Sequence, residues 1–257
     1  MFTRLKPFKD LLYVFIWRQF SVRYRNSVIG ILWAIIQPLS MMMLLTFVFT
    51  YIIQVKTGSY PKPVFFYSAL LPWSFFVSSV SGSVKSISGS QSLVTKIYFP
   101  REILPISGIC VAFLDLLIAS SLYIVLLFYY NITLTYTLIW IIPIFFVLFL
   151  FTLSVSLLFS SINVYYKDVG LIITFLMRLM FFATPIIYSI DNLSLKLKLL
   201  LFLNPMTFIV ENTRRVILEG RDIVFWQFAL ALVLVIILFH ISYKIFIKIE
   251  KDFADVI

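Results

Sequence analysis

Side chains that could carry out covalent chemistry are few in this sequence of 257 residues. It holds one histidine, His240, one cysteine, Cys110, and eleven carboxylates. A metal site needs three or four converging ligands, and neither His240 nor Cys110 has a companion at ligand spacing. The pattern GxxxxGK[ST], whose backbone cradles nucleotide phosphates, is absent, and so is a DxD pair that would hold a metal-bound sugar nucleotide. The sequence therefore predicts a protein with no catalytic or metal centre of its own.

Two ionisable residues, Asp115 and Arg178, lie inside long apolar runs. A charged residue at the centre of a membrane helix costs roughly 2.5 to 3.5 kcal/mol, so each needs a reason to be there. Counted at 1.5 Å per residue, Asp115 lies roughly 18 Å and Arg178 roughly 10 Å from the inner ends of their runs. We expect the two side chains to pair, or each to face a polar interior.

Aromatic residues make up 18% of the chain. Sugar rings have apolar C–H faces that stack on aromatic rings, so an aromatic lining would suit a polysaccharide path. Packing against lipid, with Trp and Tyr at the interfaces, is the alternative interpretation. The candidates for such a lining are Phe47, Phe49, Tyr51, Trp73, Phe75, Phe76, Phe181, Phe182 and Tyr188.

The elements that must position these residues are membrane-spanning helices. Hydrophobic residues form 62% of the chain and charged residues 12%, whereas a soluble domain carries roughly a quarter charged residues. Apolar runs near the length that crosses hydrocarbon recur six times, which predicts a single all-α membrane domain over residues 1–257. Pro38 and Pro185 fall inside the first and fifth runs and predict kinks there. The predicted spans are 28–53, 64–83, 103–130, 138–162, 171–190 and 225–247.

The distribution of basic residues predicts the orientation of these spans. The net charge of +10 comes from Lys and Arg beside apolar runs, which favours a membrane protein over a nucleic-acid-binding one. With the N-terminus inside, thirteen Lys and Arg lie on the inner side and seven on the outer side. Both termini are therefore predicted to be cytoplasmic.

Residues 8–24 are too charged to span, yet Phe8, Leu11, Phe15 and Phe20 recur at helical spacing. This pattern predicts an amphipathic helix along the inner surface. It would serve either as a plain anchor held by anionic lipid or as a docking element for a cytoplasmic partner.

Residues 191–221 contain two apolar stretches that are too short to span, divided by Asn204 and Pro205. They predict short re-entrant helices, which are tolerated at membrane depth where they pack on protein or line a wet cavity. A loop folded on the outer surface is the alternative.

An ordered set of short motifs resembles the type-2 ATP-binding-cassette exporter permeases, and most of all the branch that exports lipid-linked O-antigen or teichoic acid. Each motif is weak alone, but their order along nearly the whole chain is fairly specific. The motifs are Arg23, Tyr24, Arg25, Asn26 and Ser27; Gly30, Trp33, Gln37 and Pro38; Pro100, Arg101, Glu102, Leu104 and Pro105; Leu114 and Asp115; Tyr166, Lys167, Asp168 and Val169; Pro185 to Tyr188; and Asn204 and Pro205 with Arg214.

The resemblance implies a homodimer of six-helix subunits in the bacterial inner membrane. Each would join a separate ATPase subunit, which would bind the ATP and Mg²⁺ that this chain does not. Lipid-linked polysaccharide would be the substrate. Lys167 departs from the arginine expected there, which keeps the charge but loses the planar fork. Residues implied to couple to the ATPase are Arg23, Arg25, Lys96, Arg101, Glu102, Tyr166, Lys167 and Asp168.

Two alternatives remain open at this point. A permease of the same family that moves drugs or other lipids would share most of these motifs. A membrane glycosyltransferase or lipid-modifying enzyme belongs to a different class. A neighbouring ATPase gene beside sugar-transferase genes would favour polysaccharide export over both.

Overall fold

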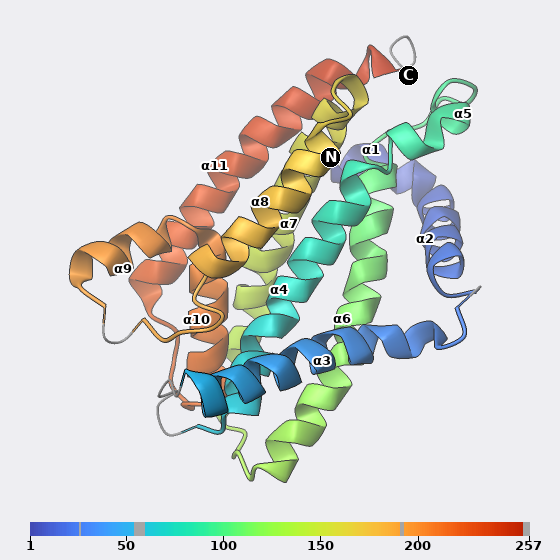
Figure 1. The fold of residues 1–257 in the computed structure, drawn as a ribbon. Coiled ribbons are helices and arrows are strands. Elements are labelled where there is room, and N and C mark those ends of the chain that lie inside the picture. Colours follow the sequence, from blue (N-terminus) through green and yellow to red (C-terminus); the bar gives the residue numbers. More distant parts are fainter. Residues whose placement is uncertain (26, 54–59, 191–192, 254–257) are drawn as a thin grey trace.

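The computed structural model describes residues 1–25, 27–53, 60–190 and 193–253, and these residues form helices and connecting segments without a strand. Asn26 of the N-terminal motif and residues 191 and 192 of the predicted re-entrant segment lie outside the described residues. Met1 and the C-terminal end of the last helix lie at the same end of the bundle, called here the terminal end; the other is the distal end (Figure 1). In chain order, the α-helices are α1 Phe2–Leu5, α2 Lys9–Tyr24, α3 Trp33–Phe47, α4 Lys62–Val84, α5 Gln91–Val94, α6 Ile103–Tyr129, α7 Ile141–Tyr165, α8 Val169–Ala183, α9 Leu195–Phe202, α10 Pro205–Ile217 and α11 Phe225–Glu250.

Among the described residues, five helical stretches are long and apolar enough to cross a membrane. The first joins α3 to a 3₁₀ turn, Gly30–Leu32, and a π-helical turn, Val48–Ile52, and the fourth joins α7 to the 3₁₀ turn Tyr136–Trp140. They confirm the predicted all-α membrane class and overlap five of the six predicted spans. The stretches are Gly30–Ile52, Lys62–Val84, Ile103–Tyr129, Tyr136–Tyr165 and Phe225–Glu250.

The fifth predicted span is shorter than the sequence suggested. Residues 171–190 were expected to form one helix with a kink at Pro185, but α8 ends at Ala183. Thr184, the residue before the proline, is extended at φ −97° and ψ 140°, because the proline ring disfavours helical backbone at the preceding residue. The 15 residues of α8 are about 22 Å long, less than the roughly 30 Å of a hydrocarbon core. Pro185 therefore terminates this helix, whereas Pro38 lies within α3 as expected.

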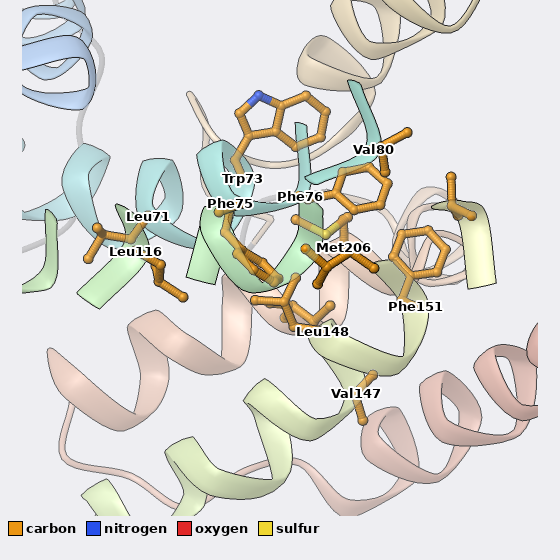
Figure 2. Packing of buried hydrophobic residues seen from close by; sticks show 14 of the residues in the cluster. Leu71, Trp73, Phe75, Phe76, Val80, Leu116, Val147, Leu148, Phe151 and Met206 are labelled. Carbon is orange, nitrogen blue, oxygen red and sulfur yellow. The ribbon is translucent and has the colours of Figure 1, made fainter. Parts of the chain in front are cut away.

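The centre of the bundle is α4, which packs against α3, α6, α7, α8 and α10. It is the least hydropathic of the five long stretches and also the most buried. Its serines Ser68, Ser79 and Ser83 are fully buried, which protein neighbours tolerate better than lipid would. Aromatic and aliphatic side chains form the core around α4. Within it, the Phe76 ring stacks on the Phe151 ring with 4.9 Å between centroids (Figure 2).

The predicted amphipathic helix over residues 8–24 forms as α2, but it runs alongside the first half of α6 rather than across its end (Figure 1). Phe15 is buried against Phe99, and Gln19 Nε2 donates to Ser107 Oγ at 2.7 Å. Residues later in α2 therefore contact residues later in the chain, from Phe99 just before α6 to Ser107 within it. These contacts place α2 against α6, and its position along the inner membrane surface stays a prediction.

Two short helices, α9 and α10, follow α8, and α10 is packed inside the bundle against α4 and α7. Pro205 begins α10, where its missing N–H costs no helical hydrogen bond. Asn204 caps it by accepting from Met206 N at 3.0 Å and also donates to Thr184 Oγ1 at 3.0 Å. Burial of α10 agrees with the prediction of a short helix that packs on protein rather than a loop on the outer surface.

Candidate functional site

A cavity of about 810 Å³ opens between α2, α3, α4 and α6, with one contribution from α8. Its lining is mostly apolar and includes Met41, Leu44, Leu70 and Leu116. Six of the motif residues that carry the family resemblance converge on it, although they are spread over more than ninety positions of sequence. These residues are Arg23, Tyr24, Trp33, Gln37, Pro38 and Asp115.

The polar end of the cavity is an ion pair between Arg23 of α2 and Asp115 of α6. The Arg23 guanidinium donates to one carboxylate oxygen of Asp115, and the Tyr24 hydroxyl donates to the other. Arg23 also approaches Ser78 Oγ at 3.5 Å. Burial and the hydrogen bond to Asp115 raise the pKa of the Tyr24 phenol to about 12, so this hydroxyl keeps its proton at neutral pH.

This pairing corrects one expectation from the sequence. Asp115 was expected either to pair with Arg178 or to face a polar interior, and the pairing is wrong: its carboxylate faces the cavity, where it accepts from Arg23 and Tyr24. The sequence indicated that Asp115 and Arg178 lie at compatible depths. It could not show that α2 packs along α6 and places Arg23 next to Asp115. Arg178 instead lies on an exposed face of α8.

The aromatic candidates for a glycan path separate into three groups. Trp73 and Phe181 line the cavity and lie 5.8 Å apart by ring centroids. Phe76 and Tyr188 form the second group, whose side chains are wholly or partly buried. Phe76 is 1% exposed in the core, so it does not face an open path in this structure. The Tyr188 hydroxyl donates to Phe182 O at 3.5 Å. The exposed rings are those of Phe47, Tyr51 and Phe182.

At the terminal end, Arg4 joins three distant parts of the chain. Its guanidinium donates to Glu102 Oε1 and to Glu250 Oε2, both at 3.1 Å, and Glu250 Oε1 accepts from the Arg101 backbone N–H at 3.0 Å. Glu102 is fully buried, and burial together with the charge of Glu250 raises its pKa. The start of α1, the segment before α6 and the end of α11 are thereby tied together.

The residues implied to couple to a partner ATPase differ in how far their side chains are exposed at the surface. Glu102 is held inside the protein by Arg4, and Arg23 is engaged by Asp115, so neither stands free at the terminal surface. Arg101 is half-buried, with its guanidinium 5.5 Å from the Tyr98 ring centroid. The remaining candidates are exposed: Arg25, Lys96, Tyr166, Lys167 and Asp168.

Metal binding has no candidate cluster among the residues that the structure describes. No group of three His, Cys, Asp or Glu side chains is close enough to hold an ion there. His240 is exposed on α11, and Cys110 is partly buried in α6.

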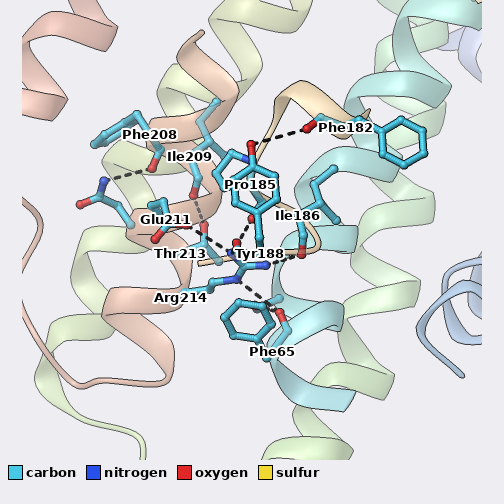
Figure 3. Close-up of polar contacts among 12 residues, drawn as sticks. Phe65, Phe182, Pro185, Ile186, Tyr188, Phe208, Ile209, Glu211, Thr213 and Arg214 are labelled. Carbon is cyan, nitrogen blue, oxygen red and sulfur yellow. Dashed lines mark hydrogen bonds and ion pairs between the residues drawn. The ribbon is translucent and has the colours of Figure 1, made fainter. Parts of the chain in front are cut away.

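Arg214 of α10 is one of the motif residues, but no structural role was predicted for it from the sequence. It is 4% exposed and donates to the carbonyl oxygens of Pro185 at 2.5 Å and Ile186 at 2.6 Å (Figure 3). Its Nε donates to Phe65 O at 3.4 Å, and Glu211 lies 3.3 Å away as an ion-pair partner. The helix end created by Pro185 leaves carbonyls without helical donors, and a planar guanidinium can serve several of them at once. That helix end was the signal that could have indicated a nearby donor.

These features define a polytopic α-helical membrane protein with a ligand-sized cavity between its helices. Residues 10–218 match the sequence profile of the ABC-2 type transporter family, and the chain belongs to that family. It is 30% identical over 254 residues to an O-antigen export system permease protein RfbA of Myxococcus xanthus, covering 98% of this chain and 96% of the relative. An RfbA of the same description from Klebsiella pneumoniae is 29% identical over 96% of this chain and 95% of its own length. The polysialic acid transport protein KpsM of Escherichia coli is 25% identical over 79% of each chain.

Proposed function

We propose that this chain is the membrane-spanning subunit of an ATP-driven exporter that moves lipid-linked polysaccharide, O-antigen or a similar glycan, out of the bacterial cytoplasm. Relatives that match almost end to end are named O-antigen export permeases, and a further relative is named a polysialic acid transport protein. The shared substrate class of these names is a long glycan.

The observation that carries the proposal is the convergence of Arg23, Tyr24 and Asp115 with Trp33, Gln37 and Pro38 on one cavity. The cavity offers apolar walls to a lipid chain and a charged, hydrogen-bonding end to a polar head. A substrate that joins a lipid to a glycan has both parts.

A second copy of the chain would cover the exposed face of α8. Leu171, Phe175, Leu179 and Phe182 are exposed there, and Arg178 lies on the same helix. An arginine within a membrane helix needs a polar surrounding or a partner, which a path between two subunits would supply. A homodimer with the glycan path at its interface accounts for both the apolar and the charged residues of this face.

The partner ATPase would dock at the terminal end, with both termini in the cytoplasm and the protein in the bacterial inner membrane. Exposed Lys96, Tyr98, Tyr166, Lys167 and Asp168 offer charge and aromatic surface for this contact. ATP and Mg²⁺ would be bound by that partner. Closure of two ATPase subunits would then push on the segments beside α6 and between α7 and α8.

Deletion of the gene in its host tests this function, with the location of lipid-linked polysaccharide as the readout. Full-length chains should accumulate on the cytoplasmic leaflet, and re-expression of the wild-type protein should restore them to the surface. Truncated or absent chains on both sides would instead indicate a role in synthesis and would overturn the export proposal.

A further inference from the structure

At the terminal end, the segment between α4 and α6, residues 85–102, is bonded to the end of α11. Helix packing alone places α6 chiefly on α4 and α11 chiefly on α7. Glu250, the last residue of α11, nevertheless reaches that segment: its Oε1 accepts from Arg101 N at 3.0 Å and its Oε2 accepts from Arg4 at 3.1 Å. These two hydrogen bonds form a first tie, between α11 and the residues that lead into α6.

A second tie joins the end of α11 to the end of α7. Asp252 follows directly after α11, and its Oδ2 accepts from the hydroxyl of Tyr165 at 3.3 Å. Tyr165 is the last residue of α7 and leads into residues 166–168. The ring of Phe253 is fully buried and edge-on to Phe246 at 5.8 Å, so the end of α11 is packed on the bundle.

A third tie joins the end of α7 back to residues 85–102. Asn163 of α7 is 3% exposed, and its Nδ2 donates to Ser88 Oγ at 3.2 Å while its Oδ1 accepts from Gly170 N at 3.1 Å. A buried amide without such partners would be costly, and here both of its ends are used. The three ties close a ring at the terminal end through residues 85–102, the end of α11 and the end of α7 (Figure 1).

The first tie is the one in this ring that is held by charge. Arg4 is bonded to Glu102 as well as to Glu250, both at 3.1 Å, and these carboxylate side chains are 0% and 8% exposed. Charge-assisted hydrogen bonds are roughly twice as strong as neutral ones. The bond between α11 and the residues before α6 therefore resists displacement more than the two neutral-donor ties do.

We propose that this ring joins residues 96–102 and residues 166–168 into one unit, which passes a push from the ATPase to α6, α7 and α11 together. The identity of the pushing partner rests on the proposed function. Residues 96–102 lead into α6 and residues 166–168 follow α7, so without the ring each segment would act on one helix. Because the end of α11 is bonded to both, displacement of one segment displaces the other.

Amide hydrogen exchange of the purified full-length protein tests the ring without reference to transport. Glu250→Ala breaks the first tie and leaves Arg4 paired with Glu102, and Tyr165→Phe breaks the second tie. Each single variant should raise exchange about threefold in the segment it releases, because the remaining ties still close the structure. The double variant should raise exchange about tenfold or more in both segments. Lys251→Gln, exposed between the two tie residues of α11, is the matched control and should exchange as the wild type does.

Export per ATP hydrolysed tests what the ring does. In membranes of the deletion host that contain the co-expressed ATPase, the double variant should continue to hydrolyse ATP while exporting about tenfold less glycan per ATP. Glu250→Gln, which fills the same space without the charge, replaces Glu250→Ala if the latter does not fold.

Three results would contradict these expectations in different ways. Exchange in the double variant that equals the product of the two single changes would mean independent local contacts and would overturn the ring. Wild-type export per ATP in the double variant, or ATP hydrolysis that falls in step with export, would overturn the transmission of the push. Wild-type protein that fails to restore export to the deletion host would instead contradict the proposed function and leave the exchange result unaffected.

Discussion

Arg214 of α10 lies over the aromatic ring of Phe65 in α4, with 3.7 Å between the guanidinium carbon and the ring centroid. The same guanidinium donates to carbonyls of the segment that follows α8. A single side chain thus connects α4, α10 and the end of α8. Because Pro185 ends α8 early, this connection replaces the helical hydrogen bonds that a longer helix would have made.

Replacement of Arg214 by lysine should destabilise the distal half of the bundle. Lysine keeps the charge but is not planar and cannot serve Pro185 and Ile186 together while stacking on Phe65. We expect the free energy of unfolding to fall by about 3 kcal/mol, since buried carbonyls lose their donors. Melting in detergent measures this, with Lys196→Arg as a control on exposed α9. Wild-type melting of Arg214→Lys would show that the contacts contribute little.

The Arg23 and Asp115 pair should behave as one unit in a double-mutant cycle. Arg23→Gln leaves Asp115 without its cationic partner, with only Tyr24 donating to it. This should cost less than the roughly 3 kcal/mol of a lone charge at the centre of a membrane helix, because the Arg23 side chain is one-third exposed to solvent. Asp115→Asn should cost less, since Tyr24 can still donate to the amide oxygen. The double variant should lose less stability than the two single losses added together. Strict additivity of the three melting measurements would rule out the coupling.

Much of this fold follows from the sequence, and the exceptions have physical causes. The positions of α4, α6, α7 and α11 follow from apolar length, because lipid requires helices of that length. The partner of Asp115 does not, because it depends on the angle at which α2 meets α6. Glu102 was implied to couple to a partner subunit, and only the folded chain brings Arg4 to it and buries its carboxylate.

Stability at the terminal end should depend on pH through Glu102. Burial, with the nearby Glu250, raises the pKa of this carboxyl in the folded protein above its ordinary value. A raised pKa means that the folded state binds the proton more tightly than the unfolded state. The contribution is therefore complete below the ordinary glutamate pKa of about 4.3 and is lost as pH rises through the folded value. Melting from pH 4 to pH 7 should show this loss.

Two substitutions identify the group responsible for that loss. Glu102→Gln should flatten the melting profile, because an amide does not titrate. Arg4→Gln should steepen it, because the ionised carboxylate then loses the guanidinium that donates to it at 3.1 Å. A profile unchanged in Glu102→Gln would assign the pH dependence to another carboxyl.

A side chain added at Gly220 should destabilise the folded protein. Its φ is +61°, and an added Cβ would lie 3.2 Å from Thr135 Oγ1 in the connection between α6 and α7. Gly220→Ala should cost about 1 to 2 kcal/mol of stability from backbone conformation and crowding together. Gly89→Ala is the control, since an added Cβ meets nothing within 4 Å there. Equal melting of the two variants would show that the backbone at Gly220 relaxes easily.

The exposed face of α8 allows a direct test of where Arg178 lies in the assembled transporter. In a Cys110→Ser background, single cysteines at Phe175 and Phe182 should cross-link two copies of the chain in native membranes if this face is the subunit interface. A cysteine at Ile237, exposed on α11, should not. Arg178→Leu should then leave folding intact while lowering export, because an apolar side chain removes the polar surface of the path but improves the fit to lipid. Cross-linking at Ile237 alone, with export unaffected in Arg178→Leu, would place α8 against lipid and remove Arg178 from the glycan path.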